Sequence, residues 1–373
     1  MNCNPFILYG YESEQYFCDR KEETAELKRL ITNGNNVALI APRRIGKTGL
    51  IENLFHQEDI AGRYYTFLID IYATKNFEEM ILSMSTTMLT ALRPKGAKVM
   101  QRFVGFLTSL RTGITFDALG NPSWNLEIGN IKQPRSTLDE IFRYINEADK
   151  PCIVAIDEFQ TVSNYGDTNV EALLRTYVQH CRNAQFIFSG SQRTMMGEIF
   201  VSPSRPFYQS TTLMSLNSIP QDIYHRFAAS HFEQAGKHLH PDSTAVVYQL
   251  FDGITWYLQR TFNELFSMTA VGEECTPDMV PLAVNNILRA NEFTYQSTLF
   301  QLPPKQKELL FAICKEGKAQ NLMSSNFIRK YHLPGSSSVQ SAIKGLLEKN
   351  FVTSTLGVYE VYDKFFARWL LVQ

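Results

Sequence analysis

Residues 41–48 read Ala41-Pro42-Arg43-Arg44-Ile45-Gly46-Lys47-Thr48, and Gly49 follows them. An apolar run at 37–40 precedes this stretch, and apolar residues at helical spacing come after it. A strand, a tight loop ending in Gly-Lys-Thr and a helix together favour a phosphate-binding loop, because the backbone N–H groups and the helix N-terminus face the phosphates. We therefore predict that residues 41–49 surround the phosphates of a nucleotide.

Two residues of this loop have predicted chemical roles. Lys47 reaches the β- and γ-phosphates, and the hydroxyl of Thr48 binds Mg²⁺. The first position departs from the usual pattern, since Ala41 stands where glycine is common. Alanine fits there only if its backbone stays outside the left-handed region. The alternative, a chance Gly-Lys-Thr at a helix start, is disfavoured by the strand and the helix on either side.

The composition is that of an ordinary globular protein. The chain has 373 residues, of which 44% are hydrophobic and 20% charged, so two or three domains are expected. The net charge of −1 gives no general attraction to nucleic acids or membranes. Six scattered cysteines fit a reducing compartment, and neither a signal peptide nor a membrane span is recognisable. We expect a cytoplasmic protein without a membrane partner.

Apolar runs recur along the first half of the chain, with helical patterns between them. After 37–40 they occupy residues 64–70, 152–156, 186–190 and 211–216. Strands alternating with helices predict an α/β fold, a P-loop NTPase core whose five-stranded, mostly parallel sheet is covered on both faces. Residues 93–135 are less regular, and turn residues at 119–122 predict a hairpin insertion at about 113–128.

Polar residues follow three of these strands, at 41–48, 157–158 and 189–193. Ligands of parallel sheets bind at the carboxyl ends of the strands, so the three clusters are expected to meet. Asp157 would bind Mg²⁺, and Glu158 would orient and polarise the attacking water. This pair favours hydrolysis of the bound nucleotide, with an inactive nucleotide switch as the alternative.

The third cluster offers groups that could reach the γ-phosphate. Ser191 and Gln192 are candidate sensors of that phosphate. Arg193 is a candidate arginine finger, acting in cis or on a neighbouring subunit, with a solvent-exposed helix start as the alternative. Arg205 is a weaker candidate for the same role.

The second half of the chain is predicted to be mostly helical. Helices are predicted near 221–235, 242–250, 254–268 and 277–296. Further helices are predicted at 303–317 and 325–331, and serines 336–338 are predicted to cap a third. Strands at 351–355 and 358–362 flank a Leu-Gly turn. Three helices and a hairpin predict a winged helix-turn-helix.

The exposed face of the third helix carries Ser337, Gln340, Ser341 and Lys344, which can reach base edges or phosphates. From residue 303 on, ten basic residues oppose five acidic ones, so this part is mildly basic. DNA is therefore a candidate partner, through residues 325–362. Winged helices also serve as lids and as docking modules for proteins, so an unknown protein partner is the alternative.

Several short motifs occur in a fixed order along the chain. They are Asn4-Pro5-Phe6, Arg20 with Glu23, Pro42-Arg43-Arg44 before Gly46-Lys47-Thr48, Asp157-Glu158-Phe159-Gln160 and Ser189-Gly190-Ser191. Over nearly its whole length the chain resembles the archaeal-type ATPase family, a group of AAA+-related signal-transduction ATPases near the origin-recognition ATPases. The resemblance implies a five-stranded ATPase core, a helical lid and a C-terminal winged helix, with ATP as the nucleotide.

The resemblance also implies further contacts with the nucleotide. Residues around Arg20 would line the adenine, and the lid would touch the nucleotide through a Gly-x-Pro element. Here Gly253-Ile254-Thr255 occupies that place, so Gly253 is retained while Thr255 replaces the proline. Thr255 and Ala41 are the two departures from the family's pattern.

The predicted domains are an ATPase core at 1–216, a helical lid domain at 217–300 and a winged helix domain at 301–373. We predict that the chain binds and hydrolyses ATP with Mg²⁺, as a conformational switch coupled to the winged helix. One alternative is an ATP-sensing, DNA-binding regulator with little or no turnover. Another is a kinase that transfers phosphate to a small acceptor.

Overall fold

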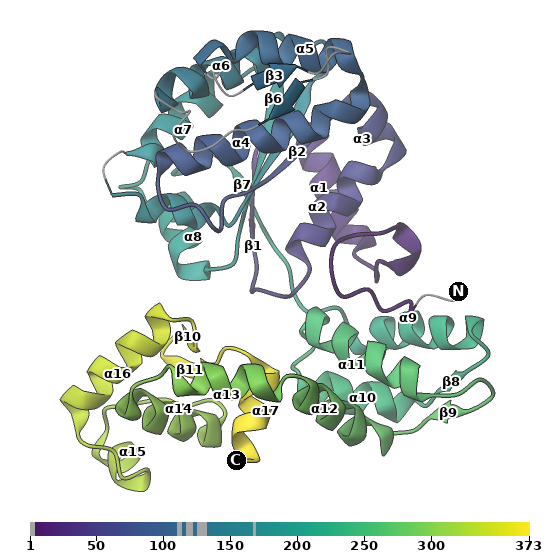
Figure 1. Ribbon diagram of the computed structural model, residues 1–373, viewed down its shortest axis with the longest axis vertical. Helices are drawn as coiled ribbons and strands as arrows, with labels where there is room; N and C mark the ends of the chain where they lie inside the picture. Colours follow the sequence, from purple (N-terminus) through teal and green to yellow (C-terminus); the bar gives the residue numbers. More distant parts are fainter. Residues whose placement is uncertain (1–3, 110–113, 117–121, 125–132, 167–168) are drawn as a thin grey trace. The chain divides into compact units, whose positions relative to one another are not determined.

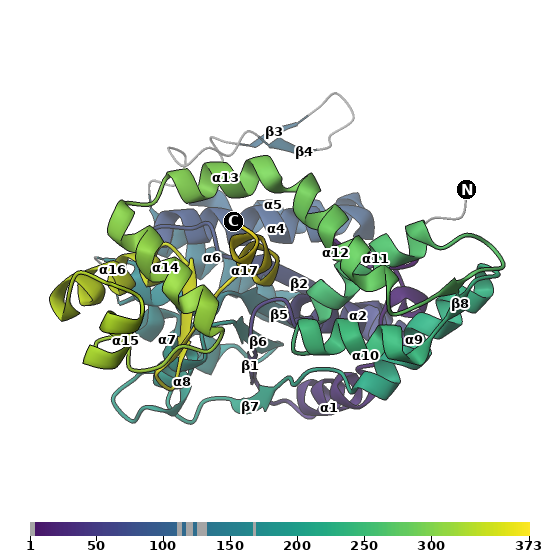
Figure 2. The ribbon, with the colours of Figure 1, turned by 90° about the horizontal axis from the view of Figure 1, so that it is seen from below.

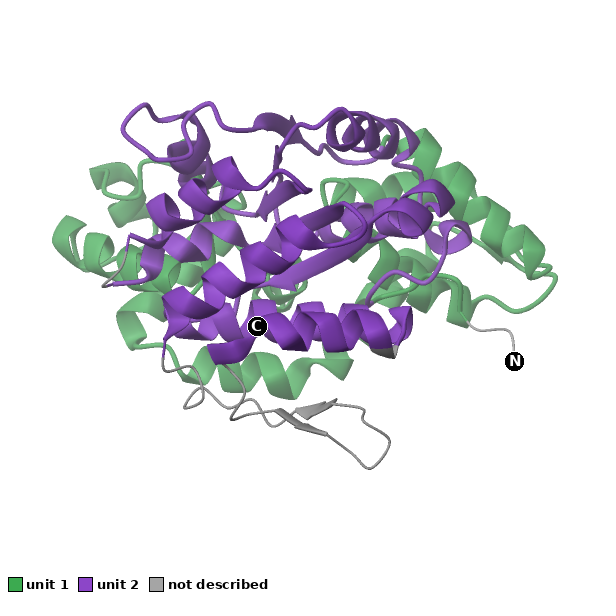
Figure 3. Ribbon diagram, turned by 90° about the horizontal axis from the view of Figure 1, so that it is seen from above, with its two compact units in different colours: residues 1–8, 220–373 green, residues 9–219 purple. Residues whose placement is uncertain are grey.

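The computed structural model describes residues 4–109, 114–116, 122–124, 133–166 and 169–373. It divides into two compact units, shown in different colours in Figure 3. The sheet unit is Tyr9–Ile219, and the lid and winged-helix unit combines Met1–Leu8 with Pro220–Gln373. The three domain ranges derived from the sequence stay a prediction beside this division.

The sheet unit is built on five parallel strands, in the order β2-β5-β6-β1-β7. The strands are β2 (Tyr65–Asp70), β5 (Cys152–Asp157), β6 (Ala184–Gly190), β1 (Val37–Ile40) and β7 (Thr212–Ser215). The five-stranded parallel sheet predicted from the sequence is confirmed. Strand β5 is buried at every residue, because helices cover both faces of a parallel sheet and its inner strands are apolar throughout.

Helices pack on both faces of the sheet (Figure 1). One face is covered by α4 (Phe77–Leu92), α5 (Ala97–Phe106), α6 (Pro134–Glu147) and α7 (Val170–His180). The other face is covered by α1 (Lys21–Thr32), α2 (Lys47–His56) and α3 (Glu58–Arg63). The methionines of α4, at 80, 84 and 88, are buried in the first of these cores, as their helical spacing predicts.

The remaining elements of the sheet unit are short. They are η1 (Glu14–Tyr16), η2 (Arg93–Lys95), η5 (Phe159–Asn164) and α8 (Arg193–Val201). In the predicted insertion, β3 (Ile114–Phe116) pairs antiparallel with β4 (Pro122–Trp124). The other residues of that insertion lie outside the described ranges. Helix α5 occupies part of the region that the sequence left irregular.

The lid consists of α9 (Gln221–Gln234), α10 (Pro241–Leu250), α11 (Thr255–Met268) and α12 (Met279–Ala290), with a short parallel pair of β8 (His238–Leu239) and β9 (Glu274–Cys275). The single helix expected at 277–296 is wrong. Helix α12 ends before Asn291, whose ψ of 4° departs from helical backbone, and α13 (Glu292–Phe300) follows.

The amino-terminal segment belongs to the lid rather than to the sheet unit. Phe6 is fully buried there among five aromatic rings of the lid helices, with Phe262 stacked at a centroid distance of 5.5 Å. The Asn4 amide donates to the Asn263 carbonyl at 2.8 Å, and the Asn263 amide donates to the Phe6 carbonyl at 3.0 Å. The chain therefore begins in one unit, passes through the other and returns.

The winged helix is confirmed (Figure 2). It consists of α14 (Pro304–Glu316), α15 (Ser325–Lys330), α16 (Ser336–Glu348), β10 (Val352–Thr355), β11 (Val358–Val361) and α17 (Lys364–Leu371). The predicted serine cap of α16 is wrong, because the N-cap residue is Gly335, which has a φ of 128° and makes no side-chain cap hydrogen bond. Gly335 takes a backbone conformation that serine rarely adopts.

Helix α17 joins the winged helix to the lid. The Lys364 ammonium lies 2.5 Å from the Asp252 carboxylate, and the Arg368 guanidinium donates to the Leu250 carbonyl at 3.0 Å. The Lys364 backbone N–H also donates to the Tyr257 hydroxyl at 3.0 Å. Among the described residues, no helix combines the length and the apolar character that crossing a lipid bilayer requires.

Candidate active site

The loop at 41–48 joins β1 to α2 at the carboxyl edge of the sheet. Two of its residues have left-handed backbone, Arg44 with a φ of 66° and Gly46 with a φ of 102°. Ala41 stays outside that region and continues the strand, its N–H donating to the Gly190 carbonyl at 3.3 Å. The usual glycine is therefore not required at this position, and Ala41 is compatible with the loop.

Lys47 is the first residue of α2, and its side chain turns back into the loop. Only 6% of the residue is exposed, and its ammonium donates to the carbonyls of Ala41 at 3.0 Å and Pro42 at 3.1 Å. Burial lowers the pKa of Lys47, while the nearby charges of Glu158 and Asp157 act in the opposite direction. The loop thus holds a cation close to two carboxylates.

Thr48, in the first turn of α2, lies beside Asp157, the last residue of β5. The Thr48 hydroxyl donates to Asp157 Oδ2 at 2.8 Å. Asp70 ends β2 directly beside Asp157 in the sheet register, and burial raises the pKa of Asp70, with Asp157 and Glu158 adding to that effect. Hydroxyl and carboxylate oxygens are the donors that Mg²⁺ prefers, so these residues fit the cation that the sequence implies.

Glu158 and Ser191 also lie together. The Ser191 hydroxyl donates to Glu158 Oε2 at 2.6 Å, and Arg43 Nε donates to Ser191 Oγ at 3.2 Å. The Arg43 guanidinium lies over the Tyr72 ring, 5.1 Å from its centroid. Glu158 has a φ of 55°, a left-handed conformation that is uncommon for a non-glycine residue and recurs at functional sites. Side chains from three strand ends are therefore connected.

Arg20 makes a contact that the sequence did not suggest. It is 3% exposed, and its Nη2 donates to the carbonyls of Ile45 at 3.2 Å and Asn217 at 2.6 Å. Its Nη1 lies 2.5 Å from the Glu23 carboxylate, one turn further along α1. Arg20 therefore connects the backbone of the phosphate-binding loop to the segment that follows β7.

Three further predicted residues lie in α8, in α2 and in the other unit. Arg193 is exposed at the first position of α8. Gly49 packs under Phe17, where an added Cβ would lie 3.1 Å from the ring. Gly253 belongs to the lid and winged-helix unit, where its φ is 66°.

Asp70 is a site residue that the sequence analysis missed, although the rule that led to Asp157 applies to it as well. Both aspartates end neighbouring parallel strands, and the register pairs them. The signal was the acidic residue at the last position of the apolar run 64–70. Gln160 is part of the motif Asp157-Glu158-Phe159-Gln160, but the sequence assigned it no role; its contacts are described below.

Arg205, the weaker arginine-finger candidate, is engaged elsewhere. Its guanidinium lies 2.6 Å from the Glu171 carboxylate and donates to the Ser163 hydroxyl at 2.8 Å. Burial raises the pKa of Glu171, and the charge of Arg205 counteracts that effect. These contacts connect α7 to η5 and indicate a structural role.

Arg205→Ala should destabilise the protein and leave nucleotide turnover unchanged. The substitution removes the partner of a buried carboxylate, which costs on the order of 2 kcal/mol. The free energy of unfolding from a denaturant titration measures this loss. Arg182→Ala, at an exposed position before β6, is the matched control. A loss of turnover without a loss of stability would instead favour a catalytic role for Arg205.

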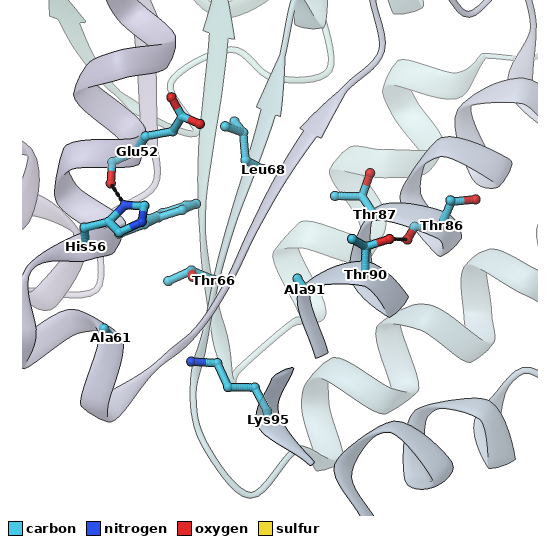
Figure 4. A pocket seen from close by; sticks show the side chains of 11 residues that line it. Glu52, His56, Ala61, Thr66, Leu68, Thr86, Thr87, Thr90, Ala91 and Lys95 are labelled. Carbon is cyan, nitrogen blue, oxygen red and sulfur yellow. Dashed lines mark hydrogen bonds between the residues drawn. The ribbon is translucent and has the colours of Figure 1, made fainter. Parts of the chain in front are cut away.

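The sheet unit also has a groove on the outer side of β2, shown in Figure 4. Its volume is about 550 Å³, and Glu52, His56, Thr86, Thr90 and Lys95 are among its lining residues. Burial raises the pKa of Glu52. None of the predicted site residues lines this groove, so it is separate from the phosphate-binding loop.

The comparisons with known proteins agree with this architecture. Residues 17–261 match the family described as an ATPase domain predominantly from Archaea, and residues 293–372 match a probable winged helix domain. No protein of curated function matches the chain.

Solved structures show the same fold at low sequence identity. The Walker-type ATPase PABY2304 of Pyrococcus abyssi is 19% identical, with 98% of this chain and 99% of that chain covered and a TM-score of 0.66. The ORC2 protein of Aeropyrum pernix, in ADPNP and ADP complexes, is 13% identical over 99% and 96% of the two chains, with a TM-score of 0.60. Because the first family match covers more than half of the chain, the protein belongs to the ATPase family found predominantly in Archaea.

Proposed function

We propose that the chain binds ATP with Mg²⁺ at residues 41–49, hydrolyses it, and uses the change of nucleotide to switch its conformation. The observation that carries this proposal is the 2.8 Å hydrogen bond between Thr48 and Asp157. This bond brings together the two oxygen ligands expected for the cation, beside the buried ammonium of Lys47. Membership of an ATPase family supports the same activity.

Each side chain then has a distinct task. Lys47 neutralises charge on the β- and γ-phosphates, and Thr48 and Asp157 hold Mg²⁺, which when bound offsets the charge of the phosphate oxygens. Glu158 accepts a proton from the attacking water, and Ser191 contacts the γ-phosphate. Arg193 is exposed, so it is accessible to phosphates of the same chain or of a neighbouring subunit.

Two contacts support a conformational switch. Arg20 bonds both the loop, at Ile45, and Asn217, which lies just before the boundary of the sheet unit at Ile219. A nucleotide that changes the loop backbone would therefore act on the segment leading to the lid. Within the other unit, the contact of Lys364 with Asp252 holds the winged helix against the lid.

Phosphate release from Mg²⁺-ATP by the purified chain, with no added acceptor, tests the hydrolysis. We expect steady release that stops when EDTA is added. Release without an acceptor would also argue against the kinase alternative. Limited proteolysis with ADP and with a non-hydrolysable ATP analogue tests the switch, for which we expect different cleavage patterns. Nucleotide binding without phosphate release would contradict the proposed hydrolysis.

A second candidate function, an ATP-sensing regulator that binds DNA, is favoured by the surface of α16. Ser337, Gln340, Ser341 and Lys344 are exposed, and Leu356 at the tip of the wing is fully exposed. A solved structure of the ORC1 protein of Aeropyrum pernix in complex with DNA shares the fold, with 11% identity and a TM-score of 0.53. An exposed polar helix beside a wing suits contact with DNA.

Lys344→Glu should weaken DNA binding if this second function holds. One fewer phosphate contact lowers the salt slope of the binding constant by about one unit. Gel-shift titrations at several salt concentrations, with and without ATP, measure the slope. Lys98→Glu makes the same charge change on the exposed side of α5 and should leave binding unchanged. An equal loss in both variants would indicate a general charge effect instead of a specific surface.

A further inference from the structure

Gln160 is a buried polar residue beside the candidate base. It lies in η5, directly after β5, and only 2% of it is exposed. Its amide Nε2 donates to Glu158 Oε2 at 2.5 Å. The same carboxylate oxygen accepts the Ser191 hydroxyl at 2.6 Å. Both hydrogen bonds are therefore made to Oε2 and neither to Oε1, the second oxygen of the carboxylate.

The other end of the Gln160 amide is unpartnered. Its Oε1 is buried and has no hydrogen-bond partner among the described residues. It lies against the backbone of Gly190, where an added Cβ would come within 2.5 Å of Oε1 and 2.3 Å of Met196 Sδ. A buried oxygen without a partner costs free energy, and methionine would fill a similar volume without that cost. Packing alone therefore does not account for the glutamine, whereas its N–H donated to Glu158 does.

We infer that Gln160 is a positioning residue that orients the Glu158 carboxylate for hydrolysis, an inference that rests on the proposed function. In the reaction, a water O–H bond breaks and its proton moves to Glu158 Oε1. The water oxygen forms a bond to the γ-phosphorus, and the bond from that phosphorus to the β–γ bridging oxygen breaks. ADP leaves with the electron pair. By holding Oε2, Gln160 limits rotation of the carboxylate and keeps Oε1 toward the water.

Gln160→Met tests this inference in the full-length chain. We expect kcat to fall about 10- to 100-fold, because loss of orientation in the active site has effects of that order. The dissociation constant for a fluorescent ATP analogue should change less than about twofold, since the Gln160 amide bonds Glu158, which lies outside the phosphate-binding loop. The thermal midpoint should stay the same or rise, because the unpartnered oxygen is removed.

Gln185→Met is the matched control. Gln185 is half-buried at the amino end of β6, the strand whose other end carries Gly190, and its replacement should leave kcat unchanged. If Gln160→Met does not fold, Gln160→Leu removes the same donor with a shorter side chain. A fall in thermal midpoint with proportional losses of kcat and binding would overturn the inference, because it would indicate a structural role.

A double-mutant cycle with Glu158→Gln separates the two roles further. If Gln160 acts through Glu158, adding Gln160→Met to Glu158→Gln should cause no additional loss of kcat. An equal loss in both backgrounds, or a normal kcat in Gln160→Met, would overturn the inference while leaving the proposed hydrolysis intact. Absence of phosphate release from the wild-type chain, with nucleotide binding retained, would overturn the proposed hydrolysis and this inference with it.

Discussion

Lys47→Ala should abolish ATP binding. The ammonium is buried in the loop and already bonds the carbonyls of Ala41 and Pro42, so it lies where phosphate oxygens would accept the same protons. A charge-assisted hydrogen bond contributes about 1.5–3 kcal/mol, and two of them correspond to an affinity loss of at least about 100-fold. Titration with a fluorescent ATP analogue measures the change.

The control for this substitution is Lys98→Ala, an exposed lysine on α5. It removes the same charge at a distance from the loop, so ATP binding should be unaffected. Circular dichroism should show that both variants are folded. Binding by folded Lys47→Ala within a few-fold of the wild type would mean that residues 41–49 do not form the phosphate site.

Glu158→Gln should retain ATP and lose turnover. Glutamine has nearly the same shape as glutamate and its oxygen can still accept the Ser191 hydroxyl, but it cannot take a proton from water at neutral pH. Loss of a positioned general base lowers kcat by about 10²- to 10⁴-fold. Phosphate release under saturating ATP measures kcat, and the fluorescent analogue measures binding.

Glu198→Gln, at an exposed position of α8, is the control for this second substitution and should behave as the wild type. The result to look for is a separation, with binding preserved and turnover lost in Glu158→Gln alone. Normal turnover in that variant would refute the assigned role of Glu158. Loss of binding together with turnover would indicate that the carboxylate supports the nucleotide site instead.

Much of the fold follows from local patterns. The inner strands β1, β5 and β6 are apolar runs, and Gly46 takes a left-handed position in the loop at 41–48 that glycine tolerates. Two errors have local causes that spacing alone does not reveal. Asn291 interrupts an apolar pattern that continues on both sides of it. At α16, Gly335 is the N-cap residue, although the serines directly after it are the residue type that usually caps a helix. Helix α17 was not predicted because it directly follows the wing.

The candidate site was predictable only in part, because its contacts join residues far apart in the chain. Strand ends indicated that Thr48, Asp157 and Glu158 belong together, and the structure places Thr48 against Asp157. The same rule would have found Asp70 if the last residue of each strand had been considered. The bond from Arg20 to Asn217 spans 197 positions and depends on how the chain returns after β7, which no local pattern encodes.

The burial of Phe6 in the lid means that the polypeptide crosses between the two units twice, after Leu8 and after Ile219. A unit held by one covalent connection can rotate about any axis. A unit held by two separate connections rotates mainly about the line that joins them. Anchoring of Phe6 in the lid thus makes the chain near Leu8 a second covalent link between the two units, in addition to completing the core of the lid.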